Sequence, residues 1–232
     1  MKRILLKLSG ESLAGKGASG IDTSMLAAFA DEISDALKLG AQVAVVLGGG
    51  NIFRGLGGSK KGVSRVQGDY MGMLATVINS LALQDTLKQR GIATEVLSGL
   101  EISPLCRKMS GPLAVELLSM NTVVIIAGGT GNPYFTTDSA AALRAVEIEA
   151  DALLKGTRVD GVYSADPEKD PHAVKFDEIS FAEAYDKHLN VMDMTAFTLC
   201  RENNMPIVVF DVNIPGNLAA LLRGEKIGTI VK

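Results

Sequence analysis

The sequence contains no tryptophan, only two cysteines and two histidines among its 232 residues, and 5% aromatic side chains. Cys106 and Cys200 lie far apart and fit no metal-ligand spacing, so we expect two reduced, structural thiols. The only histidines are His172 and His188, so a zinc site or a histidine-based catalytic triad is not expected. The core must therefore be aliphatic, and any chemistry must depend on other residue types.

Long apolar runs and concentrated positive charge are also missing. No uncharged apolar stretch reaches the roughly 18 residues that a membrane-spanning helix needs, so no membrane partner is expected. The first residues pass directly into a strand pattern without a signal peptide, which predicts a cytoplasmic protein. The formal net charge is -3 and Lys and Arg are dispersed, which argues against a nucleic acid as the main partner.

What is present is an alternation of strand-like and helix-like segments. It predicts an α/β fold with a largely parallel sheet covered by helices on both faces. The length fits one large domain or two small lobes. A long helix is expected from about Arg65 to Gln89. Its predicted core positions are Met71, Leu74, Ala75, Ile78, Leu81 and Ala82.

Four glycine-rich turns each follow a short apolar strand. They are Leu8-Ser9-Gly10, Gly48-Gly49-Gly50, Gly128-Gly129-Thr130-Gly131 and Lys155-Gly156-Thr157. At one edge of a shared sheet they would present a row of backbone N–H groups, which suits an extended polyphosphate. The pattern is not a Walker A loop, because Lys7 precedes the glycines, and Phe53 stands where a dinucleotide fingerprint needs glycine.

Charged residues accompany these turns. Lys7 and Lys155 each stand at the end of an apolar strand, so two ammonium groups could flank a transferring phosphoryl group. Asp138, in the first turn of a predicted helix, would hold both lysines in place and keep them charged. Asp69 lies four residues after Arg65, which fits either a helix-surface ion pair or a carboxylate that binds a ligand hydroxyl such as a ribose.

Together these segments resemble the amino-acid kinase superfamily and, within it, the bacterial type of UMP kinase, over nearly the whole chain. The segments that carry the resemblance are Lys7–Glu11, Gly48–Gly55, Gly68–Thr76, Thr130–Asp138 and Val159–Pro167. The resemblance implies transfer of the ATP γ-phosphoryl group to UMP, with Mg²⁺ held mainly by the phosphates. It also implies one three-layer α/β/α sandwich over residues 1–232, with a UMP side at about 1–150 and an ATP side at about 151–232.

The resemblance also implies roles for residues at matching positions. The expected catalytic residues are Lys7 and Lys155, which would stabilise the transition state, and Asp138, which would orient them. The expected ATP contacts are Lys7, Leu8, Ser9, Gly10, Gly50, Arg54, Thr157, Tyr163 and Asp166. The expected UMP contacts are Gly49, Asp69, Thr130, Gly131, Asn132, Pro133, Tyr134, Phe135, Thr136 and Thr137, with Asp69 on the ribose. No protein metal ligand is evident.

Regulation is implied by resemblance alone, since the family forms hexamers that GTP commonly activates and UTP inhibits. The matching loop consists of Gly15, Lys16, Gly17, Ala18, Ser19 and Gly20. Here it is basic and lacks the acidic and aromatic residues that some relatives have. An effector loop and a plain flexible glycine loop both stay open.

Two other functions fit parts of the pattern. A kinase of the same fold that acts on a carboxylate, such as glutamate, aspartate or acetylglutamate, would share the lysines and glycine turns but lack a pocket for a base and ribose. A nucleotide-binding regulator without turnover would keep the glycine turns and lose a lysine. The presence of both Lys7 and Lys155 counts against the regulator.

Overall fold

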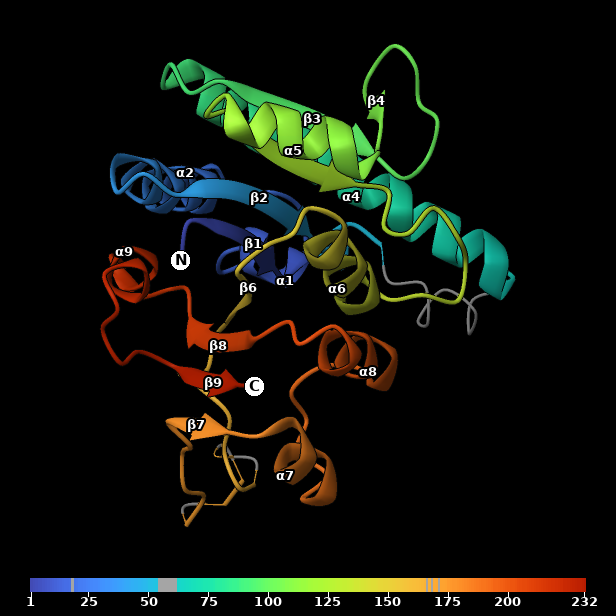
Figure 1. The fold of residues 1–232 in the computed structure, drawn as a ribbon. Coiled ribbons are helices and arrows are strands. Elements are labelled where there is room, and N and C mark those ends of the chain that lie inside the picture. Colours follow the sequence, from blue (N-terminus) through green and yellow to red (C-terminus); the bar gives the residue numbers. More distant parts are fainter. Residues whose placement is uncertain (18, 54–61, 166, 168, 171) are drawn as a thin grey trace.

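The computed structural model describes residues 1–17, 19–53, 62–165, 167, 169–170 and 172–232 (Figure 1). Three residues for which a role is expected, Ala18, Arg54 and Asp166, lie outside the described residues. The remaining candidate site residues can all be placed in the fold.

One sheet runs through the described part of the chain (Figure 1). Its strands are β1 (Arg3–Leu8), β2 (Gln42–Leu47), β3 (Thr94–Ser98), β4 (Arg107–Lys108), β5 (Val123–Ala127), β6 (Ala152–Thr157), β7 (Glu178–Ile179), β8 (Ile207–Asp211) and β9 (Thr229–Val231). They lie in the order β4-β3-β5-β2-β1-β6-β8-β9-β7, and the pairing is parallel except between β8 and β9. The predicted mostly parallel sheet is confirmed, and it places β1 at its centre.

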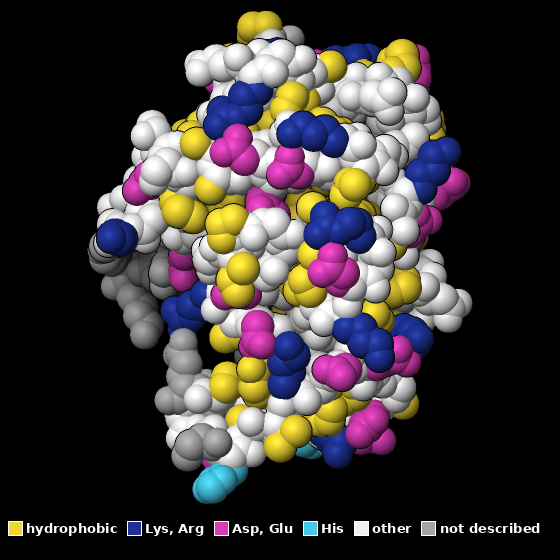
Figure 2. All heavy atoms as spheres, turned by 90° about the vertical axis from the view of Figure 1, so that its left-hand side faces the viewer, with side chains coloured by type: hydrophobic (Ala, Val, Ile, Leu, Met, Phe, Trp, Pro, Cys, Tyr) yellow, Lys and Arg dark blue, Asp and Glu magenta, His cyan; other side chains and the backbone are white. Residues whose placement is uncertain are grey.

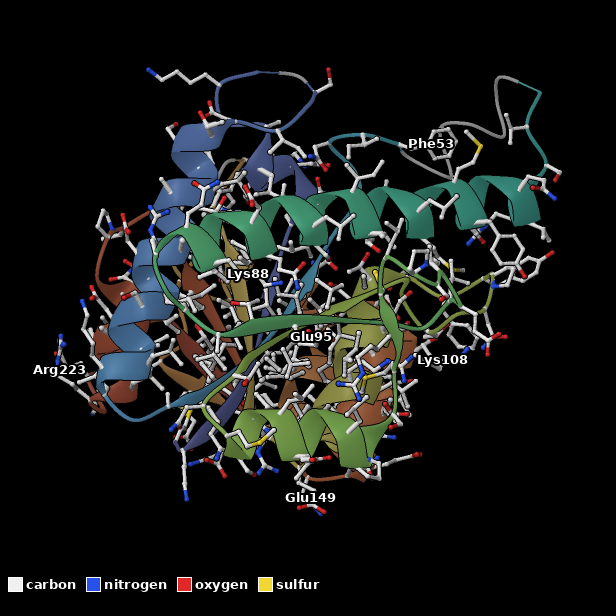
Figure 3. All side chains as sticks on the ribbon, turned by 90° about the horizontal axis from the view of Figure 1, so that it is seen from above. Phe53, Lys88, Glu95, Lys108, Glu149 and Arg223 are labelled. Carbon is white, nitrogen blue, oxygen red and sulfur yellow. The ribbon has the colours of Figure 1, made fainter. Side chains whose placement is uncertain are left out.

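Helices cover both faces of this sheet. They are α1 (Gly10–Leu13), α2 (Thr23–Lys38), α4 (Arg65–Gln89), α5 (Gly111–Ser119), α6 (Thr137–Glu147), α7 (Phe181–Asp186), α8 (Met194–Glu202) and α9 (Asn217–Leu222). Figure 3 shows α4 on one side of the sheet and α5 on the other. Local sequence explains several boundaries: the Asp22 carboxylate caps α2 by accepting from Ser24 N at 2.8 Å, and Gly40 follows α2 with φ 82°.

The strand residues alternate between two hydrophobic cores. Leu5 and Val46 face one core, which α5, α6, α7 and α8 complete, whereas Ile4 and Leu6 face the other, which α2, α4 and α9 complete. Alternation follows from the two-residue period of a strand, and burial on both faces explains why β1, β2 and β5 are almost entirely apolar. The predicted three-layer α/β/α arrangement is confirmed.

The predicted core face of α4 is wrong for its largest residues. Met71, Leu74 and Ile78 are 41, 47 and 50% exposed, although Ala75 is buried as expected. Around Gly72 and Ala75 the helix faces the turn after β2 with small residues because that turn comes very close: a Cβ on Gly49 would lie 2.7 Å from the Gly72 carbonyl oxygen and 2.9 Å from Ala75 Cβ, and the large buried residues of α4 are instead Met73, Val77, Leu83 and Leu87. A bulky side chain has no space at that contact.

The remaining surface and thiol features agree with the composition. Cys106 is half-buried and Cys200 buried, and both are free; burial raises the pKa of the Cys200 thiol to about 12. The face in Figure 2 intersperses Lys and Arg with Asp and Glu. Within the described ranges, no helix combines the length and apolar character that crossing a membrane requires.

Candidate active site

Two lysines and one aspartate meet where β1 and β6 end. Lys7 and Lys155 are register partners on these parallel neighbours, so their side chains leave the same face of the sheet. Asp138 comes from the first turn of α6 and bridges them: its Oδ1 lies 2.7 Å from Lys7 Nζ and its Oδ2 lies 3.0 Å from Lys155 Nζ. The three side chains, 12 to 17% exposed, form what we term the charge centre.

Burial and charge act in opposite directions on the groups of the charge centre. Burial alone would raise the pKa of the Asp138 carboxyl, but the charges and hydrogen bonds of Lys7 and Lys155 outweigh it, and the pKa lies below its ordinary value. Burial lowers the pKa of the Lys155 ammonium, and the nearby Lys7 charge acts in the same direction while Asp138 opposes both. Asp138 is therefore a carboxylate over the physiological pH range and suits a positioning role better than that of a proton acceptor.

The segment before α8 supports the charge centre, and sequence reasoning missed it. Lys155 Nζ donates to the Val191 carbonyl oxygen at 2.7 Å. Two residues later, the Asp193 carboxylate accepts hydrogen bonds from the hydroxyls of Thr136 and Ser139, at the start of α6. An N-cap pattern at Asp193 was the available signal, since its carboxylate also accepts from Ala196 N at 3.0 Å. Nothing in the residue type at 191 points to a contact made by its backbone.

Two connected clefts open beside the charge centre. The first has a volume of about 930 Å³ and is lined by Lys7, Ser9 and Lys16 among others, and the second has about 520 Å³ and reaches Tyr163. Both include Lys155, Thr157 and Arg158 in their walls. Residues 187–191 also line the second cleft, although they were not among the site residues expected from the sequence. Clefts that combine apolar walls with Lys7, Lys155 and Arg158 suit a nucleoside triphosphate, whose base is apolar and whose phosphates are anionic.

Four of the residues expected to contact ATP, Lys7, Ser9, Thr157 and Tyr163, line these two clefts, and their contacts with ATP stay predictions. The Thr157 hydroxyl donates to the Val159 carbonyl oxygen at 2.6 Å, and Tyr163 Oη donates to Asp160 Oδ1 at 2.6 Å. The Leu8 side chain is fully buried, so Leu8 can reach a ligand through its backbone alone. Gly10 is buried and Gly50 half-buried, both where β1 and β2 lead into their glycine turns.

Asp69 contacts the loop that precedes α6. Asp69 and this loop were both expected to contact UMP, so they should lie close together. Its Oδ2 accepts from Tyr134 N at 2.8 Å and from Arg65 Nε at 2.8 Å. The Arg65 guanidinium lies 5.5 Å from the centre of the Tyr134 ring. Of the two alternatives considered for Asp69, the helix ion pair with Arg65 is present, and binding of a ligand hydroxyl stays a prediction; the Asp69 side chain is 11% exposed.

The loop itself, residues 130–137, projects from tightly turned backbone. Gly131 and Tyr134 have φ of 85° and 73°, and Gly128 and Gly129 before them are also left-handed. Tyr134 is 67% and Phe135 48% exposed. Thr130, Asn132 and Phe135 line a third cleft, about 620 Å³, against α8, while Thr136 caps α6 and Thr137 begins it. Pro133 is half-buried between them.

The loop over residues 15–20 lies at the edge of the first cleft. Gly15 and Lys16 line that cleft, and Gly20 N donates to the Asn51 carbonyl oxygen at 2.9 Å. Gly17 N donates back to Ala14 O at 2.9 Å. The contact with Asn51 places the end of this loop against the turn after β2.

Comparison with known proteins agrees with this arrangement. The model of the amino acid kinase family matches residues 2–211. The chain belongs to the amino acid kinase family. It is 57% identical over 230 residues to a uridylate kinase of Porphyromonas gingivalis, covering 99% of this chain and 96% of that protein.

Two solved structures have the same fold over the whole chain. The UMP kinase of Bacillus anthracis superimposes with a TM-score of 0.96 at 34% identity, covering 100% of this chain and 96% of that one. The UMP kinase of Ureaplasma parvum gives 0.94 at 39% identity, covering 100% and 98%. The family assignment expected from the sequence is confirmed.

Proposed function

We propose that this protein is a nucleoside monophosphate kinase that transfers the γ-phosphoryl group of ATP to UMP, giving UDP and ADP, in pyrimidine nucleotide synthesis. The observation that carries the proposal is the charge centre, with Lys7 and Lys155 held on either side of Asp138 at the ends of adjacent central strands. The uridylate kinase relative at 57% identity supports UMP as the acceptor.

The chemistry of the site fits phosphoryl transfer between two phosphates. The UMP phosphate is already an anion near neutral pH, so it needs positioning and charge neutralisation more than a general base. Lys7 and Lys155 supply two positive charges for the oxygens of the transferring group. Each oxygen of the Asp138 carboxylate pairs with one of the two ammonium groups, which fixes both lysines in place.

We assign ATP to the two clefts and UMP to the region beside Asp69 and the 130–137 loop. UMP would then contact the expected half at about 1–150, whereas ATP would contact residues 151–232 and also the turn after β1, which lines the first cleft. The roles of Ser9, Thr157 and Tyr163 on ATP, and of Asp69 on the ribose, are part of this proposal. Their support is their position along the clefts and loop.

Magnesium would accompany ATP. In the part of the chain that the structure describes, no three His, Cys, Asp or Glu side chains come close enough together to hold a metal ion. The described side chains thus do not form a protein cage for Mg²⁺, which ordinarily keeps its waters and binds through nucleotide phosphates. We therefore assign the ion to the ATP phosphates and no protein residue to it.

We further propose that the protein is a cytoplasmic homohexamer that responds to GTP and UTP. Support for assembly comes from α4, whose Met71, Leu74 and Ile78 form an exposed apolar stripe at helical spacing. The loop over 15–20 is the proposed effector element because it contacts both the first cleft and Asn51. Sedimentation velocity tests the hexamer, and the rate of ADP release with and without GTP or UTP tests the response to these nucleotides.

A coupled ADP-release assay with ATP and Mg²⁺ tests the function. UMP, CMP, dUMP, glutamate and aspartate are offered separately, with ATP alone as the control for hydrolysis. We expect rapid ADP release with UMP and background rates with both amino acids. Turnover with an amino acid would keep the fold and overturn the acceptor, and nucleotide binding without any turnover would favour a regulator.

A further inference from the structure

Two amide side chains form a completely buried pair behind the turn that follows β2. Asn51 is 2% and Asn79, on α4, 0% exposed. Asn79 Nδ2 donates to Asn51 Oδ1 at 2.8 Å, and Asn51 Nδ2 donates to Asn79 Oδ1 at 3.0 Å. The other two N–H groups donate to backbone carbonyl oxygens, from Asn79 to Gly48 at 2.7 Å and from Asn51 to Gly20 at 2.8 Å. Every N–H of the pair is thus satisfied.

The pair contacts two of the glycine turns that face the charge centre. Gly48 belongs to the turn after β2, and its N–H donates to the Leu8 carbonyl oxygen at 2.9 Å. A Cβ on Gly10, in the turn after β1, would lie 2.7 Å from Asn51 Oδ1 and 2.6 Å from the Gly48 carbonyl oxygen. The Asn51 side chain therefore packs against Gly10 at the place where the backbones of the two turns meet.

Neighbouring polar residues on α4 make different contacts. The buried Ser80 hydroxyl donates to the Thr76 carbonyl oxygen within the same helix. The Thr76 hydroxyl instead accepts from Gly128 N at 2.9 Å, in the turn after β5. Asn79 thus bonds the turn after β2 and its residue Asn51, Thr76 bonds the turn that leads into the 130–137 loop, and Ser80 bonds only within the helix.

Simple space filling does not require amides at this position. An apolar side chain such as leucine fills similar volume, and a buried polar pair is tolerated only when every group is satisfied. What the amides add is direction: Asn79 fixes the Gly48 carbonyl of the turn after β2 relative to α4, and Asn51, bonded to Asn79, fixes the Gly20 carbonyl of the neighbouring loop. Phosphoryl transfer depends on placing backbone donors and charges to a fraction of an ångström.

We propose that Asn51 and Asn79 are positioning residues that hold the turns after β1 and β2 in the spacing that the ATP triphosphate requires. This rests on the proposed function for the identity of the ligand. The pair touches neither nucleotide and acts through the backbone of Ser9–Gly10 and Gly48–Gly50. Loss of the pair weakens ATP binding and slows phosphoryl transfer. UMP binding, which depends on the Thr76 side of α4, is little affected.

The variant Asn79→Leu tests the proposal, with Ser80→Ala as its matched control. Both residues are fully buried on the same helix, but the serine bonds only within α4. We expect Asn79→Leu to weaken Mg–ATP binding, measured by calorimetry without UMP, about tenfold, because the Gly48 carbonyl and the Asn51 amide lose their partner and the turn after β2 can shift. The KM for UMP should stay within about twofold. Ser80→Ala should lower Tm and leave both nucleotides within about twofold.

A double-mutant cycle sharpens the test. Asn51→Ala, Asn79→Ala and the double variant should show strongly non-additive losses of ATP affinity, because either single change already breaks the pair. If Asn79→Leu does not fold, Asn79→Ser replaces it, and we expect its effect to be smaller and still confined to ATP.

Three results would overturn the positioning role. The first is unchanged ATP affinity in a folded Asn79 variant, and the second is an equal loss of ATP and UMP affinity in that variant. The third is a loss of ATP affinity in Ser80→Ala as large as that in the Asn79 variant when both have the same Tm. Failure of the proposed function has a different signature. Wild-type protein that binds ATP but does not phosphorylate UMP would refute that function, while the ATP-binding comparison still decides the role of Asn79. Wild-type protein that does not bind ATP would refute both.

Discussion

The charge centre and the 130–137 loop are built in opposite ways. Lys7, Asp138 and Lys155 are mostly buried, paired with one another at 2.7 and 3.0 Å, and attached to central strands or a capped helix. The loop instead exposes Tyr134 and Phe135 and is tied to α4 through a backbone N–H. One region has its charges in place before any ligand arrives, whereas the other presents surface to a ligand.

The difference indicates a division of labour. Groups that stabilise charge in a transition state act most effectively when they are already oriented and shielded from water. Groups that recognise a nucleotide need access, and exposed loops provide it. Changes in the charge centre should therefore reduce kcat, and changes around the loop should raise the KM for UMP.

The largest expected effect is that of Lys155→Ala. The variant removes one of the two charges proposed to neutralise the transferring group, so kcat should fall about 10³-fold. UMP affinity, measured by calorimetry, should change little, because this contact matters mostly in the transition state. Near-normal turnover would remove Lys155 from the mechanism.

Asp69→Asn probes the other region. It replaces a carboxylate with a neutral acceptor, so the KM for UMP should rise about tenfold while kcat at saturating UMP changes less than about threefold. Asp35→Asn is the control, because Asp35 forms an exposed ion pair with Lys38 far from the loop and should leave both constants unchanged. A change in kcat alone for Asp69→Asn would contradict the assignment of kcat effects to the charge centre and of KM effects to the loop.

The pH dependence of kcat/KM tests the charge centre without removing it, because kcat/KM reports groups of the free protein. Burial lowers the pKa of Lys155 from 10.5, so kcat/KM should decline on the alkaline side with a midpoint below that value. Between its folded and unfolded pKa, this lysine is deprotonated more in the folded state, so its contribution to the free energy of unfolding rises with pH while activity falls. The Lys155→Arg variant stays charged and should lack the alkaline decline at whatever rate it retains.

The smallest expected effect is that of Arg65→Lys. Arg65 pairs with Asp69 and stacks on Tyr134, but it is 37% exposed, and exposed pairs of this kind contribute about 0.2–1 kcal/mol. The KM for UMP should therefore rise by no more than about fivefold. Arg90→Lys, which alters an ion pair with Asp31 elsewhere on the surface, should have no effect on it. If Arg65→Lys raised the KM for UMP more than Asp69→Asn does, Arg65 would contribute more to UMP binding than Asp69, contrary to this prediction.

The sequence predicted the layers and most strand ends because period-two and helical patterns are local signals. Lys7 and Lys155 could be paired in advance, since both end apolar strands that lead into glycine turns. The core face of α4 could not be predicted from apolar spacing, because the close approach of Gly49 selects small side chains there and turns Leu74 and Ile78 outward. That approach is a tertiary contact with no periodic signature.

Contacts made through backbone atoms likewise could not be predicted from the sequence. The Val191 carbonyl holds Lys155, and the Tyr134 N–H meets Asp69, yet neither contact depends on the side chain at 191 or 134. Asn79 was hidden for another reason: an asparagine within a helical pattern gives no sign of facing a buried partner such as Asn51.

The most direct test of the account is phosphorus NMR of ATP and UMP at saturating concentrations with wild-type protein and with Lys155→Ala. The account predicts that wild-type protein forms UDP and ADP in equal amounts, and that the variant forms UDP about 10³-fold more slowly with both nucleotides bound. ATP loss without UDP, or UDP formation by the variant near the wild-type rate, would contradict it.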